Sequence, residues 1–438
     1  MMSIKVSIPY ESPDSRNISM SLEIPEHNFV ATLLPKVPPP IDNLDTVILD
    51  ALDKPVKGPK FSDLLDHGRK ITIIIDNQFR PTPTHKILPP ILDVIEDKKS
   101  QTSLIIASGS VPPPSLKEIE NKIGSKTLER IGVENIYVNE SRKREKYVFR
   151  GITSHGTPVW VHRVVALADV VIGIGMVQAE PFAGYGGGGK LILPGVSSYD
   201  TIEANHRLVI SPDVYPGNPD NIVRHDIDEA ADMGKLDFLI DVVMNVRGEV
   251  AAVFSGYHRA VFKQAVKYYD NIYKVKVPTR EKVHVAISGT FWPTDHLYFH
   301  TGWTVNNLDL IVKDDGTIIH ASPAPGYEEW HGFALMDLMK SYMPPTRENF
   351  ERALRDIISG KVEMWSGCIW FKFYEVLTRK NVIIITEENN LKFINDVGLT
   401  GFSRNNAQRA VDEAVKRYGN DAKIVIIPYG KWTIPILK

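Results

Sequence analysis

Residues 70–109 read "KITIIIDNQFRPTPTHKILPPILDVIEDKKSQTSLIIASG", and this stretch decides the fold class. Two apolar strands, "KITIIID" at 70–76 and "SLIIASG" at 103–109, flank one predicted helix, "HKILPPILDVIEDKK" at 85–99. A further apolar strand, "ALADVVIGIG" at 166–175, continues the pattern. Buried strands that alternate with helices are typical of a mostly parallel sheet whose two faces are covered by helices.

A second set of strand and helix patterns begins near residue 280. It consists of the strands "KVHVAISG" (282–289), "KNVIIIT" (380–386) and "AKIVIIPYG" (422–430) and the amphipathic helix "AQRAVDEAVKRYG" (407–419). The length of 438 residues also exceeds what one hydrophobic core usually organises. We therefore predict two α/β domains with mostly parallel sheets and an interdomain cleft, a cofactor-binding domain at 1–275 and a second domain at 276–438.

The composition is that of a soluble globular protein, with 43% hydrophobic and 24% charged residues. Because the formal net charge is -2, no basic excess is present to bind a phosphate backbone, and we expect no nucleic-acid partner. The single cysteine, Cys368, excludes an internal disulfide framework and fits a reducing, cytoplasmic location. It is expected in an apolar core patch with Trp365 and Trp370. No apolar run is long enough to span a bilayer, so we expect no membrane association.

Polar segments follow the predicted strands of the first unit. They are "DNQFRPTP" at 76–83, "SGSVPPP" at 108–114 and "GMVQAEPFAGYGGGGK" at 175–190. Parallel sheets bind ligands beyond the carboxyl ends of their strands. We therefore expect these three segments to converge on one crevice.

The most unusual stretch is "EPFAGYGGGGKLILPG" at 180–195. Gly184, Gly189 and Lys190 match the G-x-x-x-x-G-K part of a phosphate-binding P-loop, whose next residue is Ser or Thr and binds Mg²⁺. Leu191 stands there instead, and "LILPG" is expected to continue as an extended segment where a P-loop would begin a helix. These two features count against a nucleotide hydrolase. From the residues alone, Lys190 is a phosphate-binding or surface lysine on a flexible loop.

Five segments, taken in order, resemble one known family: "DNQFRPTP", "IASGS", "AGYGGGGKLILPG", "TIEANH" and "IVIIPYG". Over nearly its whole length the chain resembles the lactate racemase family of nickel-pincer-nucleotide-dependent 2-hydroxyacid racemases and epimerases. The resemblance implies that Lys190 is bonded covalently to the cofactor, a pyridinium-3-thioamide-5-thiocarboxylic acid mononucleotide, and that His206 binds nickel. It also implies a loop whose backbone N–H groups face the cofactor phosphate. The residues expected at the cofactor are Asp76, Tyr185, Gly186, Gly187, Gly188, Gly189 and Lys190.

The chemistry implied by the resemblance requires a base and a cation beside the cofactor. Removing the hydrogen of a 2-hydroxy acid as a hydride leaves a stable keto acid, and a pyridinium can accept that hydride. The hydroxyl proton has to leave with the hydride, so a general base must lie within hydrogen-bond reach. A substrate carboxylate suits the planar guanidinium of an arginine. Arg80 is the candidate, and Asp76 is expected to orient the cofactor or Arg80.

Four positions depart from the family pattern. Val111 and Glu180 stand where lactate-type members have catalytic histidines. His300 and Trp303 stand where a glutamine and a lysine are expected. Valine cannot carry a proton, whereas glutamate can if burial raises its pKa toward neutrality. We therefore expect Glu180 and His300 to handle protons. Arg80 and Trp303 are expected to contact a substrate other than lactate.

Each assignment has a plainer alternative. For Glu180 the alternative is a structural carboxylate, and for Arg80 it is an ion pair with Asp76. A helix-face histidine bonded to the backbone is the alternative to a nickel ligand at His206. For the whole protein, the alternative is a non-catalytic binder of a nucleotide or organic acid on the same fold. The expected partners are a small 2-hydroxy acid and the enzymes that make and insert the cofactor.

Overall fold

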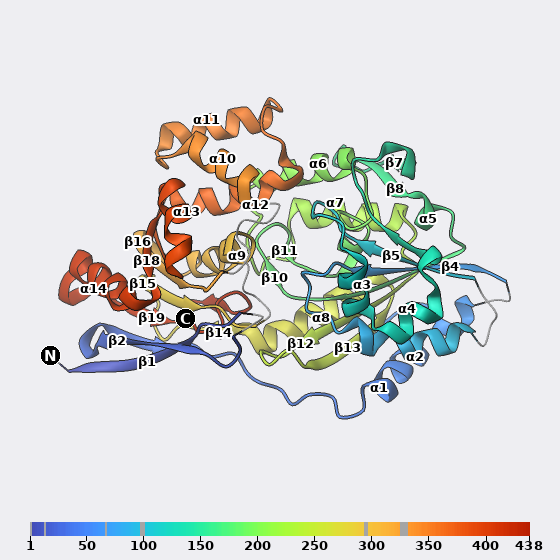
Figure 1. Ribbon diagram of the computed structural model, residues 1–438, viewed down its shortest axis with the longest axis horizontal. Helices are drawn as coiled ribbons and strands as arrows, with labels where there is room; N and C mark the ends of the chain where they lie inside the picture. The colour runs from blue at the N-terminus through green and yellow to red at the C-terminus, as the bar shows by residue number, and fades with distance from the viewer. Residues whose placement is uncertain (1, 13–14, 66–67, 97–100, 293–296, 325–331) are drawn as a thin grey trace.

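The computed structural model describes residues 2–12, 15–65, 68–96, 101–292, 297–324 and 332–438, and of residues 297–300 and 332–334 it describes the backbone alone. Two six-stranded sheets lie side by side, one from the first part of the chain and one largely from the last part (Figure 1). The predicted α/β class with two mostly parallel sheets is confirmed. None of the helices in these ranges combines the length and apolar character that crossing a membrane requires.

The first sheet has the strand order β13-β12-β9-β4-β5-β6. Its strands are β4 (Lys70–Asp76), β5 (Gln101–Ala107), β6 (Ile136–Val138), β9 (Val170–Met176), β12 (Phe238–Met244) and β13 (Val250–Gly256). β13 is antiparallel to β12, and the other neighbouring pairs are parallel. Because the chain continues from β4 to β5 on one side and later adds β9 on the other, the strand order reverses between β4 and β9. A ligand crevice is expected outside the carboxyl ends of the strands at such a reversal.

Helices cover both faces of this sheet because its strands are apolar on both sides. Ile71, Ile73 and Ile75 of β4 face a core built with helices α1, α2, α3 and α8, whereas Ile74 faces a core built with α5, α6 and α7. The alternation follows from the two-residue repeat of a strand. The helices are α1 (Leu44–Asp53), α2 (Thr84–Glu96), α3 (Leu116–Ile123), α4 (Ser125–Ile131), α5 (Arg163–Ala166), α6 (Tyr199–Arg207), α7 (Ile222–Met233) and α8 (His258–Tyr273).

The second sheet is parallel throughout, with the order β18-β17-β16-β15-β19-β3. One face packs on the hairpin β1–β2 and on α14, and the other packs on α9 and α12. Its strands are β3 (Phe29–Thr32), β15 (Val283–Gly289), β16 (Val312–Ala321), β17 (Asn381–Thr386), β18 (Thr400–Ser403) and β19 (Ile424–Ile426). The helices of this part are α9 (Leu297–Asp309), α10 (Gly332–Tyr342), α11 (Arg347–Ile358), α12 (Met364–Leu377), α13 (Leu391–Asp396) and α14 (Ala407–Tyr418).

Short two-stranded sheets complete the fold. They pair β1 (Ser3–Pro9) with β2 (Ser19–Pro25), β7 (Tyr147–Ile152) with β8 (Pro158–His162), β10 (Ala179–Glu180) with β11 (Gly184–Tyr185), and β14 (Lys274–Lys276) with β20 (Ile434–Ile436). The predicted division at 275/276 falls within β14 and stays a prediction. Residues 3–9, 19–25 and 29–32 pack with the second sheet, because β3 is one of its strands and β1–β2 covers one of its faces.

Candidate active site

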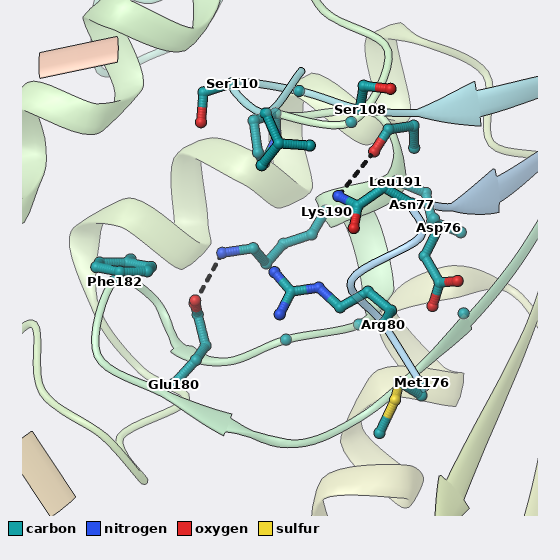
Figure 2. A pocket seen from close by; sticks show the side chains of 18 of the residues that line it. Asp76, Asn77, Arg80, Ser108, Ser110, Met176, Glu180, Phe182, Lys190 and Leu191 are labelled. Atoms are coloured by element: carbon teal, nitrogen blue, oxygen red, sulfur yellow. Dashed lines mark hydrogen bonds and ion pairs between the residues drawn. The ribbon is translucent and has the colours of Figure 1, made fainter. Parts of the chain in front are cut away.

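One cavity collects the three polar segments that follow the strands of the first sheet, as the sequence predicts (Figure 2). It lies at the reversal between β4 and β9, and α6 and α12 close it from the side of the second sheet. The residues that line it are Asp76, Asn77, Arg80, Ala107, Ser108, Gly109, Ser110, Val111, Gly175, Met176, Gln178, Glu180, Phe182, Gly186, Gly187, Lys190, Leu191, Pro194, Gly195, His206, Cys368 and Ile369. One site therefore contains residues from three separate segments of the chain: Asp76 and Arg80, Glu180 and Lys190, and His206.

The glycine segment reaches Lys190 through the short 3-10 helix η5 (Gly188–Leu191). The residues after it form turns, and α6 begins only at Tyr199, so the expectation that "LILPG" is extended is wrong. The tight turn satisfies backbone groups locally, since the N–H groups of Ile192 and Leu193 both bond to the Gly189 carbonyl. No α-helix starts at Lys190, which still separates this loop from a P-loop.

Two buried polar side chains, Asp241 and Arg224, hold the glycine loop in place. Asp241 of β12 accepts a hydrogen bond from the Gly188 N–H at 2.7 Å, and Arg224 of α7 donates to the carbonyls of Tyr185 and Gly187. Burial raises the pKa of Asp241 to about 7. At Gly187, φ is +83°, and a Cβ atom would lie 2.9 Å from the Met176 carbonyl oxygen. Only a residue without a side chain fits this crossing of the loop over β9.

Lys190 forms an ion pair with Glu180 inside the cavity. Its Nζ donates to Glu180 Oε1 at 2.8 Å, with the two side chains 14% and 1% exposed. Figure 2 shows the side chains of Arg80, Glu180 and Lys190 pointing toward one another. Burial lowers the pKa of Lys190, and the negative charge of Glu180 opposes that shift. A lysine so placed is a better nucleophile than a surface lysine, because more of it is the neutral amine.

Asp76, at the end of β4, is bound to groups that shape the loop carrying Arg80. Its carboxylate forms an ion pair of 2.6 Å with Lys122 of α3 and accepts a hydrogen bond from the Thr82 hydroxyl. Lys122 also donates to the backbone carbonyls of Arg80 and Thr82, at 2.8 and 3.2 Å. The Arg80 guanidinium carbon lies 4.8 Å from the centre of the Trp303 ring. Lys122 and Asp76 therefore position the loop, and Arg80 is presented to the cavity.

His206 of α6 is held by the first turn of α12. Its Nδ1 lies 2.9 Å from the Trp365 carbonyl oxygen, so Nδ1 carries the proton and Nε2 keeps the lone pair that can bind a metal. The Trp365 N–H in turn bonds to Glu203, one turn earlier on α6. Burial, with the charge of Lys190 nearby, lowers the pKa of His206 to about 4, so the imidazole is neutral near pH 7.

The donors available to a metal at His206 are few. Cys368 Sγ lies 3.4 Å from His206 Nδ1, and both residues line the cavity. Among the residues that the structure describes, no group of three or more His, Cys, Asp and Glu side chains is arranged to hold a metal ion. A metal at His206 therefore needs most of its ligands from a bound cofactor. Sulfur donors on a lysine-tethered cofactor, joined by one imidazole, fit this arrangement.

Other predicted residues lie beside the cavity rather than on its lining. Tyr185 is buried, and its hydroxyl bonds to Asp270 at 2.5 Å. A Cβ atom at Gly188 would touch Phe262 of α8, and one at Gly189 would touch Ala231 of α7. The described lining includes neither glycine nor Tyr185. Their part in cofactor binding stays a prediction, and their described contacts are with α7 and α8.

Trp303 and His300 come from α9 of the second part of the chain. Trp303 is 1% exposed, and its ring lies 6.1 Å from that of Phe182, a lining residue. The Lys431 Nζ lies 4.8 Å from the same indole ring. Trp303 thus stands directly behind the Arg80 and Phe182 side of the cavity. The His300 side chain lies outside the described residues.

Three residues at the site were not predicted from the sequence. Lys122, Arg224 and Asp241 are ordinary helix or strand positions by pattern, yet all three are buried and contact the loops that carry Arg80 and Lys190. Cys368 lies at the cavity and not only in an apolar core patch, which corrects the expectation for it. A charged residue within an apolar strand, such as Asp241 in "FLIDVVM", is the one hint that the text offers.

Comparison with known proteins gives a consistent result along the chain. A family model for the lactate racemase N-terminal domain matches residues 16–216. A lactate racemase of Thermoanaerobacterium thermosaccharolyticum is 25% identical over 391 residues, covering 88% of this chain and 89% of that protein. A lactate racemase of Lactiplantibacillus plantarum is 26% identical over 438 residues, covering 98% of each.

Solved structures agree in fold. The lactate racemase apoprotein of Thermoanaerobacterium thermosaccharolyticum superimposes with a TM-score of 0.86 at 23% identity, covering 99% of this chain and 100% of that one. A Thermotoga maritima protein gives a TM-score of 0.69 at 17% identity, covering 92% and 100%. Residues 16–216 match the lactate racemase N-terminal domain, and the chain is a distant homologue of these lactate racemases, at about 25% identity over nearly its full length. Both curated relatives are named as lactate racemases.

Proposed function

We propose that the protein racemises or epimerises a 2-hydroxy acid other than lactate, with a nickel-pincer nucleotide attached to Lys190 and its nickel bound by His206. The observation that carries the proposal is that Lys190 and His206 line the same cavity as Arg80 and Glu180. The donor set supports it as well, because His206 offers Nε2, and the described part of the chain has no group of three or more His, Cys, Asp or Glu side chains that could hold a metal by itself. When bound, the cofactor supplies a pyridinium ring that accepts a hydride and returns it.

The side chains of the chain itself have separate tasks. Arg80 binds the substrate carboxylate, and its loop is held by the ion pair between Asp76 and Lys122. Glu180 accepts the proton of the substrate hydroxyl and returns it when the keto group is reduced again. Phe182 and Trp303 provide apolar surface beside Arg80, which excludes water from the reacting carbon. The catalytic part assigned to His300 remains a prediction.

The substrate proposal depends on the two positions that differ from lactate-type members. Val111 and Glu180 both line the cavity, so each change alters the surface that a substrate meets. A site with one carboxyl group in place of two histidines holds different protons and a different charge. These changes support a hydroxy acid other than lactate, and they leave the cofactor-attachment residue Lys190 in place.

The test is intact mass and nickel content of protein produced together with the cofactor-synthesis enzymes. The wild type is expected to carry one adduct and about one nickel per chain. Lys190→Arg keeps the charge but cannot form the same bond, and it is expected to lose the adduct. His206→Ala is expected to keep the adduct and lose nickel. An unmodified Lys190 peptide without nickel, from a host that loads a known lactate racemase, would overturn the proposal.

The rival function is a non-catalytic binder of a nucleotide or organic acid on the same fold, and Val111 at the cavity is the observation in its favour. Val111→His with Trp303→Lys distinguishes the two. Recovery of racemase activity on lactate by the adduct-carrying double variant supports a diverged enzyme. An adduct-carrying double variant that binds hydroxy acids without racemising any supports the binder.

A further inference from the structure

A second cavity lies at the amino ends of strands whose carboxyl ends form the candidate active site. Lys70, which begins β4, lines this second cavity, whereas Asp76, which ends β4, lines the first. The volume of the second cavity is about 570 Å³. Sites for small molecules have volumes of about 300–1,000 Å³, so the second cavity is large enough to hold one.

Polar side chains form one wall of the second cavity, because the sheet face is incompletely covered there. Lys70 pairs with Gln101 and Thr72 with Ser103 across β4 and β5, and all four residues line the cavity. The connection from β6 to β9 contains the hairpin β7–β8 and α5, a helix of four residues. Such a helix is only about 6 Å long, too short to cover strands of this length. The cavity therefore results from the topology of the first sheet.

The lining of the second cavity carries more positive than negative charge. Lys70, Lys146 and Arg163 line it, together with the carboxylate of Glu145. The Lys146 ammonium also pairs with Glu140, and an ammonium group has further N–H donors for a ligand. Arg163 donates one N–H to the Glu145 carbonyl at 3.3 Å and likewise has others. The excess of cations suits a phosphate monoester, which carries a charge of about −2 near pH 7.

A buried hydrogen-bond donor also belongs to this lining. His162 is 5% exposed, and its Nδ1 accepts the Val164 N–H at 3.3 Å. Burial lowers the pKa of His162 to about 4, so near pH 7 the ring is neutral and Nε2 carries the proton. Within the part of the chain that the structure describes, Nε2 has no hydrogen-bond partner. Burying an unpaired N–H is unfavourable, so an acceptor on a bound molecule would stabilise this donor.

Two exposed apolar side chains stand beside the polar groups. Tyr137 of β6 is 37% exposed, and Leu167, which follows α5, is 64% exposed. Both line the cavity, and the rings of Tyr137 and His162 lie 6.3 Å apart. A flat ring packed on Tyr137 and Leu167 would remove apolar surface from water. A ligand that joins a phosphate to a ring therefore uses both parts of the lining.

We propose that the second cavity binds a nucleoside monophosphate. The phosphate bonds to Lys70, Lys146 and Arg163, and the base packs on Tyr137 and Leu167. The proposal does not depend on the function proposed above, because the described linings of the two cavities share no residue. Failure of one proposal therefore leaves the other standing.

Isothermal titration calorimetry of the unloaded full chain tests the proposal with three probes: adenosine monophosphate, adenosine and inorganic phosphate. The wild type is expected to bind adenosine monophosphate about tenfold or more tightly than either of the other two, because only the nucleotide contacts both parts of the lining. Inorganic phosphate that binds as tightly as the nucleotide would overturn the assignment of a nucleoside. A wild type that binds none of the three would overturn the site.

The double variant Lys70→Gln/Arg163→Gln locates the binding. Both side chains are exposed, so the fold is expected to persist. Affinity for adenosine monophosphate is expected to fall about tenfold or more, because each change removes a hydrogen bond from a charged donor. The matched control Lys54→Gln/Arg347→Gln removes the same charge at side chains that are 70% and 92% exposed elsewhere. An equal loss in this control would mean that only the net charge of the protein matters, and it would overturn the site.

Two further variants separate the cavities and test the buried donor. Lys190→Gln changes the first cavity, and it is expected to leave the nucleotide affinity of the second unchanged. Binding that is lost in Lys190→Gln but kept in Lys70→Gln/Arg163→Gln would overturn the proposal, because the nucleotide would then occupy the first cavity. His162→Phe keeps an aromatic ring without the Nε2 donor, and it is expected to weaken nucleotide binding about threefold or more.

Discussion

The two parallel sheets have the same strand number and nearly the same construction, but their carboxyl ends differ. In the first sheet the ends of β4 and β9 lead to Asp76, Arg80 and Glu180 around a cavity. In the second sheet the end of β15 is covered by the chain's own N-terminal segment. Glu11 donates its N–H to the Thr290 carbonyl at 2.9 Å, and a Cβ at Gly289 would lie 2.1 Å from the Pro9 carbonyl oxygen.

This difference between the two sheet ends shows what a strand-order reversal needs in order to form a ligand site. Both sheets reverse their order, next to β4 in one and next to β15 in the other, so topology offers a crevice in each. The first crevice is lined by charged side chains on loops that follow the ends of the strands and form no strand of the sheet. In the described residues of the second, backbone hydrogen bonds and close packing by Pro9 and Glu11 cover the end of β15. The fold provides the place, and the chemistry comes from charged groups left facing open space.

The largest expected effect is a loss of stability when the ion pair between Asp76 and Lys122 is broken. Lys122→Met leaves the buried carboxylate of Asp76 without its cation, which costs about 3–5 kcal/mol of unfolding free energy. Lys117→Met on the same helix removes an ion pair that is mostly exposed, and it is expected to cost about 0–1 kcal/mol. Urea unfolding measures both. Equal losses in the two variants would show that the end of β4 is no more dependent on charge than the surface.

A smaller loss of stability is expected from glycine substitutions at the two sheet ends, and adduct formation distinguishes the two positions. Gly187→Ala and Gly289→Ala each introduce a methyl group against backbone, and each is expected to cost about 1–3 kcal/mol in thermal or urea unfolding. Adduct formation is expected to fail only in Gly187→Ala, because that change displaces the loop that carries Lys190. Gly419→Ala, at φ +66° with open space around it, measures the backbone penalty alone, about 1 kcal/mol. Loss of the adduct in Gly289→Ala would assign the second sheet end a part in loading.

A dependence of stability on pH is also expected in the first sheet. The pKa of Asp241 is raised to about 7 by burial, whereas an unfolded aspartate titrates near about 4. Between these values the folded protein binds more protons at this residue than the unfolded chain, so its contribution to the unfolding free energy falls as pH rises. Asp241→Asn removes the titration and keeps an acceptor for the Gly188 N–H. Its stability relative to the wild type is therefore expected to increase from about pH 4 to about pH 7.

That prediction is checked by urea unfolding of the wild type and Asp241→Asn at several pH values within the window. A difference that stays constant with pH would mean that Asp241 is ionised in the folded protein throughout. The glycine loop would then be held by a permanent charge.

Much of the first sheet and of its site can be predicted from the amino-acid sequence, because apolar runs and short polar motifs are local patterns of the chain. The apolar runs at 70–76 and 170–176 form strands β4 and β9. The polar residues that follow them meet at the carboxyl edge of the first sheet. The segment 310–323, which by pattern could be a strand pair or a helix and a strand, forms the single strand β16. Its ambiguity is physical, since a turn-forming "KDDG" within an apolar run is compatible with either outcome until the neighbouring strands pair with it.

The buried residues that hold the site loops could not be predicted from the sequence. Nothing near Lys122 or Arg224 in the sequence says that Asp76 or the Tyr185 carbonyl will lie within reach. Their partners are 46 and 39 positions away (122 less 76, and 224 less 185), and only packing of α3 and α7 on the sheet brings them together. The same holds for the α12 carbonyl that orients His206, which comes from the other part of the chain.

The sequence by itself determined the class of fold and the sheet edge at which the cavity lies, and it predicted Arg80, Glu180, Lys190 and His206 as site residues, all of which line that cavity. Strand periodicity and short motifs carry these features, and both are local properties of the chain. The tertiary structure alone decided that Glu180 is the partner of Lys190, that the Trp365 carbonyl orients the His206 ring, and that the N-terminal segment covers the end of β15. These features depend on distances between remote segments, which burial of apolar faces sets only once the whole chain is folded.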